Sequence, residues 1–286
     1  MIIDDGKLPL VSVVIPNRNR TNSLYKAVIS VFRQTYKNWE IIIVDDSDRE
    51  KFEEIAKFLN DKKNVFLYQG DRKGDYGARV KGFNLSRGEY VAFLDSDDYW
   101  DPDKLLKHIH LFSSSDEFSV TWDNLIVETK NGERIKIEKP KWLMEKRIVP
   151  QVLVLKKMIM ENFIHMSCGV IKRCSLIEIG GPFMESPFDY VLWINLSTRF
   201  SFGYLDESLT NKTESIDSLG LNKHVLFVEN WNITKIKIRV LFKNKSVFKT
   251  FEKVFYFSYV LIMSVGIQIL FPTRIRKIFR PIFFKS

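Results

Sequence analysis

Cysteine, glycine and proline are all scarce in this sequence, and each shortage excludes a class of protein. The 286 residues contain two cysteines, Cys168 and Cys174, which are too few for a disulfide framework and indicate a reducing compartment. With 13 glycines and 9 prolines, collagen-like and low-complexity sequences are excluded, and 45% hydrophobic residues exclude disorder. The first residues lack the basic and apolar leader of a secretory signal, so we expect the body of the protein in the cytosol.

Acidic residues are almost absent from the C-terminal fifth of the chain. Residues 231–286 contain twelve Lys or Arg and a single acid, Glu252, which gives a formal charge of +11, whereas the preceding 230 residues carry −2. The net charge of +9 therefore belongs to the tail. Because a nucleic-acid-binding protein needs basic residues on its folded body, this distribution argues against nucleic acid as a partner.

The basic tail encloses an apolar run, residues 254–271, whose 18 residues carry no formal charge. This length is at the short edge of the range of about 17–25 residues for a spanning helix, and both flanks are basic, whereas a spanning helix has its Lys and Arg mainly on one side. We therefore predict that residues 226–286 form a helical tail that attaches peripherally or monotopically to anionic lipids at the cytoplasmic face of the cell membrane. The alternative is that its helices pack on the body or in a homo-oligomer.

Residues 1–225 alternate between apolar runs and amphipathic stretches. We expect strands at residues 11–15, 40–44, 65–68 and 90–94, and helices at residues 24–32, 52–59 and 78–85. This order is typical of an α/β protein with a Rossmann-like, mostly parallel sheet flanked by helices. In such sheets, ligands bind beyond the carboxyl ends of the strands.

Polar residues follow three of these strands, as residues 17–20, Asp45-Asp46 and residues 95–98. Asp95 and Asp97 are two apart in an extended segment and face the same side, so they predict a site for a hard cation such as Mg²⁺ or Mn²⁺. The alternative is an acidic turn before a helix that begins near Pro102. Asp45-Asp46 either forms a solvated turn or accepts hydrogen bonds from a nucleobase or ribose.

Four ordered segments resemble family 2 glycosyltransferases. They are VSVVIPNRNR (residues 11–20), SVFRQTY (30–36), WEIIIVDDS (39–47) and GEYVAFLDSDDYW (88–100). The resemblance is close over about 110 residues and continues more weakly, through Ile179-Gly180-Gly181 and Asp189 to Trp193, to about residue 220. It implies a GT-A fold, with a nucleotide-sugar half (residues 1–110) and an acceptor half (residues 111–225), and sugar transfer with inversion at the anomeric carbon.

The resemblance also implies roles for individual residues. Asp46, with Asp45, would contact the base and ribose, and Asp95 and Asp97 would be the DxD pair that holds Mn²⁺ or Mg²⁺ on the donor diphosphate. The expected nucleotide-sugar-binding residues are Pro16, Asn17, Asn19, Asp45, Asp46, Arg79, Asp95 and Ser96.

Inverting transfer also needs a base for the acceptor hydroxyl. Asp189 matches the carboxylate that acts as general base in this family, on a segment that enters a helix. The family usually has Glu-Asp where this chain has Phe188-Asp189, so Glu185 is an alternative base and a helix N-cap is an alternative role for Asp189. The four histidines, His108, His110, His165 and His224, have no partner at a ligand spacing and are expected to be structural.

The expected function is therefore transfer of a sugar from a nucleotide-sugar, a UDP-sugar in the first place, by a metal-dependent, inverting hexosyltransferase. Membrane attachment predicts that the acceptor is a lipid-linked saccharide of surface polysaccharide biosynthesis. The other hypothesis is a catalytically silent, membrane-anchored protein that binds nucleotide-sugars. It is motivated by Phe188-Asp189 and by Val80, where the family frequently has Asn.

Overall fold

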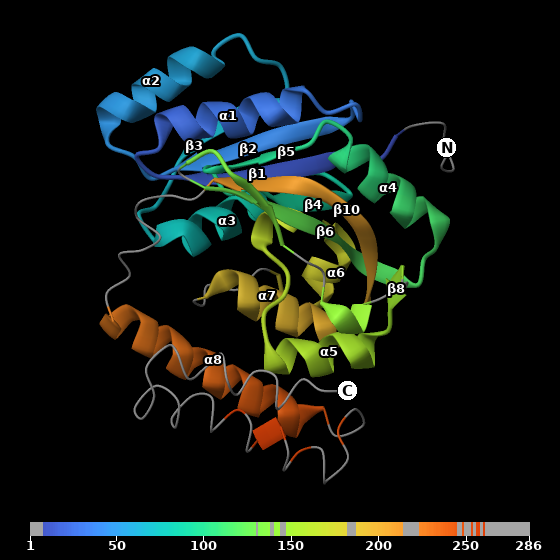
Figure 1. The fold of residues 1–286 in the computed structure, drawn as a ribbon. Coiled ribbons are helices and arrows are strands. Elements are labelled where there is room, and N and C mark those ends of the chain that lie inside the picture. The colour runs from blue at the N-terminus through green and yellow to red at the C-terminus, as the bar shows by residue number, and fades with distance from the viewer. Residues whose placement is uncertain are drawn as a thin grey trace.

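The structure, a computed structural model, describes residues 8–129, 131–137, 140–143, 147–181, 187–213 and 223–244, together with Phe248, Lys253, Tyr256, Phe257 and Val260. Its centre is a ten-stranded sheet with the strand order β3-β2-β1-β4-β9-β6-β10-β5, and β7 and β8 pair with β6 and β10. Helices cover both faces of this sheet (Figure 1).

The N-terminal half alternates strands and helices as the sequence predicts. Its elements are β1 (Val11–Asn17), α1 (Thr21–Phe32), β2 (Trp39–Asp45), α2 (Arg49–Leu59), β3 (Val65–Gln69), α3 (Gly74–Leu85) and β4 (Tyr90–Phe93). The four strands pair in parallel, in the order β3-β2-β1-β4. Every residue of β1, β2 and β4 is buried, which explains why these strands read as continuous apolar runs.

The two faces of β1 pack against different helices. Val11, Val13 and Ile15 belong to the hydrophobic cluster that contains the buried apolar residues of α1. Val14, which points to the other face, packs under α3, where a Cβ on Gly82 would lie 2.4 Å from Val14 Cγ1. The period of two along the strand therefore places one helical layer on each side of the sheet.

The second half of the chain adds antiparallel pairing. Its elements are β5 (Asp98–Trp100), α4 (Lys104–Ser114), β6 (Phe118–Glu128), β7 (Arg134–Lys136), η1 (Lys141–Leu143), β8 (Ile148–Val149), α5 (Gln151–Met160), η2 (Met166–Cys168), β9 (Gly169–Lys172), α6 (Arg173–Glu178), α7 (Phe188–Ser197), β10 (Ser201–Thr213) and α8 (Lys223–Lys243). The short β9 lies antiparallel between β4 and β6, and β6 and β10 pair in parallel. The α/β fold class is confirmed, and the sheet is purely parallel only as far as β4.

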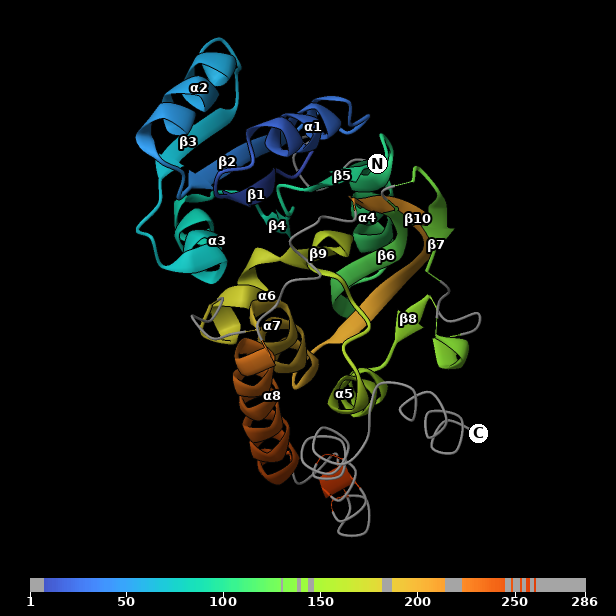
Figure 2. The ribbon, with the colours of Figure 1, turned by 60° about the vertical axis from the view of Figure 1, so that its left-hand side comes forward.

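The helices α5, α7 and α8 lie together on the side of the sheet away from α1 and α2 (Figures 1 and 2). Trp193 of α7 is fully buried and packs against Gly169, where any Cβ would come within 2.3 Å of the indole. Ile236, Val240 and Leu241 of α8 belong to the same hydrophobic cluster. The first part of the predicted tail therefore packs on the body.

The predicted apolar run at residues 254–271 lies outside the described residues, except for Tyr256, Phe257 and Val260. Among the helices that the structure does describe, none has the length and hydropathy needed to cross a bilayer.

Candidate active site

A cavity of about 900 Å³ opens at the carboxyl ends of β1, β2 and β4. Most of the residues expected at the site line it, namely Pro16, Asn17, Asn19, Asp46, Arg79, Asp95, Ser96, Asp97 and Asp189. The remaining wall includes Arg18, Arg20, Asp75, His165, Phe188 and Lys212. Asp45 does not line the cavity, and Glu185 lies outside the described residues.

Asp45 fixes the loop after β1, which forms part of the cavity wall. Its side chain is fully buried, and Oδ1 accepts hydrogen bonds from Asn17 Nδ2 at 2.9 Å and from Ser47 Oγ at 2.5 Å. Ser47 Oγ in turn accepts from the backbone N–H of Asn19 at 2.7 Å, where Asn19 adopts a φ of 56°. The carboxylate expected to contact the nucleotide thus fixes the loop after β1 instead.

Asp46, the next residue, faces the cavity. Its Oδ1 accepts from the backbone N–H of Arg72 at 2.8 Å, and its own N–H donates to the carbonyl of Asn17. Gly70 lies directly behind the carboxylate, and a Cβ there would come within 2.0 Å of Asp46 Oδ1. The absence of a side chain at residue 70 is therefore what lets Asp46 take this position.

Asp95 is held by a buried arginine. Its Oδ1 accepts from Arg79 Nη2 at 2.5 Å, while Arg79 Nη1 donates to Asp75 at 2.5 Å. The guanidinium also lies 5.1 Å from the centre of the Phe188 ring, on the wall that carries Asp189. Burial by itself raises the pKa of Asp95, but the charge of the Arg79 guanidinium and its hydrogen bond act in the opposite direction, and the pKa falls below its usual value.

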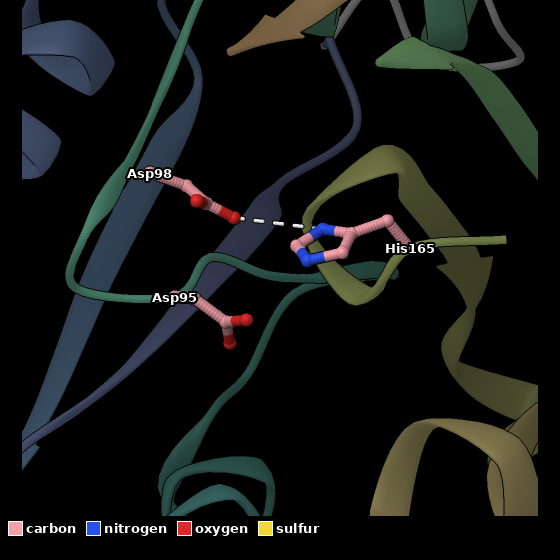
Figure 3. Close-up of side chains that lie close together, drawn as sticks. All are labelled: Asp95, Asp98 and His165. Carbon is pink, nitrogen blue, oxygen red and sulfur yellow. Dashed lines mark ion pairs between the residues drawn. The ribbon is translucent and has the colours of Figure 1, made fainter. Parts of the chain in front are cut away.

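Asp97, the predicted second member of the metal pair, has a different partner. Its Oδ2 accepts from Arg20 Nη1 at 2.6 Å. The groups that converge with Asp95 are Asp98 and His165, and one ligand atom of each of the three lies within 4.8 Å of the others (Figure 3). Nδ1 of His165 is 3.5 Å from Asp98 Oδ2.

This group fits a divalent cation by its chemistry. Among the side chains that the structure describes, Oδ1 of Asp98 is a buried atom without a hydrogen-bond partner, which a cation would satisfy. Burial lowers the pKa of His165 to about 4, so the imidazole is neutral near pH 7, as a metal ligand must be. The structure thus brings His165, which was expected to be structural, beside two carboxylates that are far away from it in sequence.

Ser167 connects the two segments that carry these groups. Its hydroxyl donates to Asp98 Oδ2 at 2.5 Å and accepts from the backbone N–H of Asp95 at 3.1 Å. Its carbonyl accepts from the Trp100 indole N–H at 2.9 Å and from Thr210 Oγ1 at 3.3 Å. A fully buried serine thus fastens the acidic turn to the η2 turn that presents His165.

A second buried cluster lies behind η2. Lys104 Nζ donates to Asp123 Oδ1, to the carbonyl of Cys168 at 3.0 Å and to His108 Nε2 at 3.2 Å. The side chains of Lys104, His108 and Asp123 are all 0% exposed. His108 is therefore structural as expected, and its ring joins α4 to β6 through Thr121.

Asp189 lines the cavity as the second residue of α7. Its Oδ2 accepts from Asn162 Nδ2 at 3.0 Å and its Oδ1 from the backbone N–H of Tyr190 at 2.7 Å. The N-cap of α7 is Pro187, so the alternative of Asp189 as that cap is wrong. Burial raises the pKa of the Asp189 carboxyl above its usual value, which makes the carboxylate a stronger base.

Comparison with known proteins agrees with this geometry. "Glycosyl transferase family 2" matches residues 12–173. WfaP of Escherichia coli, a UDP-Glc:alpha-D-GlcNAc-diphosphoundecaprenol beta-1,3-glucosyltransferase, is 29% identical over 194 residues, which cover 67% of this chain and 72% of WfaP. TuaG of Bacillus subtilis (strain 168), a putative teichuronic acid biosynthesis glycosyltransferase, is 28% identical over 228 residues, 78% of this chain and 86% of TuaG.

The fold is also similar to that of solved structures. Residues 1–349 of TarS from S. aureus in complex with UDP-GlcNAc give a TM-score of 0.67 at 13% identity, over 94% of this chain and 78% of that one. At this identity the similarity concerns the fold, which is GT-A. With the family match over residues 12–173, which is more than half of the sequence, this chain belongs to glycosyl transferase family 2.

Proposed function

We propose that the protein transfers a sugar from a UDP-sugar to a hydroxyl of a lipid-linked saccharide, with inversion, in surface polysaccharide biosynthesis. The observation that carries this proposal is that Asp46, the acidic turn and Asp189 at the start of α7 all line one cavity. A relative supports the choice of substrates, because the name of WfaP specifies UDP-Glc and an acceptor on diphosphoundecaprenol.

The nucleoside is assigned to the end of the cavity formed by Pro16, Asn17 and Asp46. A carboxylate at the end of β2 can accept hydrogen bonds from a nucleobase N–H or from ribose hydroxyls. Because Gly70 and the N–H of Arg72 fix the Asp46 carboxylate, it is preorganised for such a contact.

A divalent cation, Mn²⁺ or Mg²⁺, would be held by Asp95, Asp98 and His165, with Asp97 close by on the same turn. Bound there, it would act as a Lewis acid that neutralises charge on the departing diphosphate. Arg79 keeps Asp95 ionised for this role.

Asp189 is assigned as the general base. The acceptor oxygen forms a bond to the anomeric carbon, the bond from that carbon to the diphosphate oxygen breaks, and the acceptor proton passes to the Asp189 carboxylate. The amide of Asn162 holds Oδ2 and the backbone N–H of Tyr190 holds Oδ1, so the carboxylate that lines the cavity is fixed in place.

The C-terminal segment is assigned to the membrane surface, at the cytoplasmic face, where a lipid-linked acceptor is present. Its charge of +11 over residues 231–286 supports this, since each basic residue near an anionic surface contributes about 1 kcal/mol. A full-length variant with Gln at Arg274, Arg276, Lys277 and Arg280 should sediment less with phosphatidylglycerol vesicles than the wild-type protein. Equal sedimentation of the two proteins would contradict this assignment.

The activity itself is tested by incubating the full chain with Mn²⁺ and a panel of UDP- and GDP-sugars, and scoring release of the nucleoside diphosphate. We expect slow hydrolysis of a UDP-sugar that stops when EDTA removes the metal. Binding of a nucleotide-sugar without hydrolysis or transfer would favour the catalytically silent alternative.

A further inference from the structure

Lys212 projects into the cavity from β10, next to the acidic turn. It is the second-last residue of the strand and pairs with Asp98 of β5 in the antiparallel register. Its Nζ lies 3.2 Å from His165 Nε2. In the tautomer that carries its proton on Nδ1, His165 accepts a hydrogen bond from the Lys212 ammonium through Nε2, and a cation that took this lone pair would release Lys212 toward the cavity.

Across the described ranges, Lys212 lacks the carboxylate partner that two of the arginines lining the cavity have. Arg20 is paired with Asp97, and Arg79 with Asp75 and Asp95. Within the part of the chain that the structure describes, no carboxylate lies within ion-pair distance of Lys212, and its hydrogen-bond partner is an imidazole, which carries no negative charge. Lys212 therefore presents a positive charge that an anion entering the cavity can use.

The end of β10 is firmly fixed at this point. Oδ2 of Asp123 accepts from the backbone N–H of Leu209 at 3.0 Å and from Thr210 Oγ1 at 2.9 Å, and Lys104 holds Asp123 from the other side. Thr210 also donates to the carbonyl of Ser167, which belongs to the turn that carries His165. A binding group on such a braced strand loses little freedom when its ligand arrives.

We propose that Lys212 is a diphosphate-binding residue of this site, with His165 holding its ammonium toward the cavity until a nucleoside diphosphate enters. A phosphate oxygen carries formal charge and is a stronger acceptor for an ammonium than an imidazole nitrogen, so the ligand displaces His165 as the partner of Lys212. The inference rests on the proposed function, since it requires that the cavity takes a nucleotide.

The test compares UDP with uridine, which lacks the phosphates, by isothermal titration calorimetry on the full chain in the presence of Mn²⁺. The variants are Lys212→Gln, Lys212→Arg and, as a matched loss of one positive charge outside the cavity, Lys107→Gln, whose side chain pairs with Glu207 on the surface. We expect Lys212→Gln to bind UDP about 10- to 100-fold more weakly, with uridine affinity unchanged. Lys212→Arg should recover part of the loss, and Lys107→Gln should match the wild-type protein.

Equal UDP affinity of Lys212→Gln and the wild-type protein would overturn the assignment. So would a parallel loss of uridine affinity, because that pattern belongs to a residue that only maintains the fold. A wild-type protein that binds neither UDP nor GDP would contradict the proposed function itself, whatever the variants do.

Discussion

Replacement of Lys104 by methionine should destabilise the protein in a pH-dependent way. The change leaves Asp123 buried without its ammonium partner, and breaking a fully buried ion pair costs about 3–5 kcal/mol. We therefore expect the free energy of unfolding at pH 8 to fall by about this amount. The carboxylate keeps hydrogen bonds from Leu209 and Thr210, which favours the lower end of the range.

The size of this loss depends on His108. In the wild-type protein, burial and the charge of Lys104 lower the pKa of His108 to about 4. In the unfolded chain His108 is protonated near pH 6.5, whereas in the native protein it stays neutral down to about pH 4. The free energy of unfolding of the wild-type protein therefore falls by about 2 kcal/mol between pH 8 and pH 5. Without Lys104, protonated His108 can serve as the counter-ion of Asp123, so the pKa of His108 in the native variant rises. The free energy of unfolding of the variant should therefore fall much less between pH 8 and pH 5.

The difference in free energy of unfolding between the wild-type protein and Lys104→Met should therefore become smaller by about 1–2 kcal/mol from pH 8 to pH 5. Urea denaturation followed by tryptophan fluorescence at both pH values measures it, and contributions from His165 cancel because both proteins contain it. The Lys107→Met variant, at a half-buried residue on the surface, serves as the control, and its free energy of unfolding should fall by less than about 1 kcal/mol at either pH. A difference that is the same at both pH values would refute the reasoning about His108.

Three further predictions concern the site. Asp189→Asn should lower sugar transfer by about 10²–10⁴ while UDP still binds, and an equal fall for the surface variant Asp116→Asn would contradict the assignment. Ser167→Ala removes the hydroxyl that bonds to Asp98 and to the backbone of Asp95, and it should weaken Mn²⁺ binding about 10- to 100-fold in an electron paramagnetic resonance titration. Unchanged Mn²⁺ affinity would show that Ser167 does not position the ligands. Gly70→Ala should displace Asp46 and weaken uridine binding about tenfold or more in calorimetry, and full affinity would mean that Asp46 does not contact the nucleoside.

The N-terminal half of the fold was predictable because its strands are buried on both faces. Runs such as residues 11–15 and 40–44 are apolar at every position but one, and the polar residues that follow them must lie at one edge of a parallel sheet. This reasoning correctly predicted that Asp46 and Asp95 would line one cavity.

The rest of the site depends on contacts that sequence spacing does not encode. His165 and Lys212 each come from separate segments of the second half, and only the antiparallel insertion of β9 and the long β10 brings them beside Asp95. Asp45 shows that a residue adjacent in sequence to a site residue can still lie outside the site. It stands next to Asp46, but the alternation of side chains along the strand end turns it into the interior, where Asn17 and Ser47 bind it.

The central claim, inverting transfer from a nucleotide-sugar with Asp189 as base, is tested most directly by the anomeric configuration of the product. The full chain would be incubated with Mn²⁺, UDP-glucose and a lipid that carries diphosphate-linked N-acetylglucosamine, and the new linkage identified by NMR. We expect a β-linkage formed from the α-linked donor, and no product with Asp189→Asn. An α-linked product, or the same amount of product from the variant, would contradict the account.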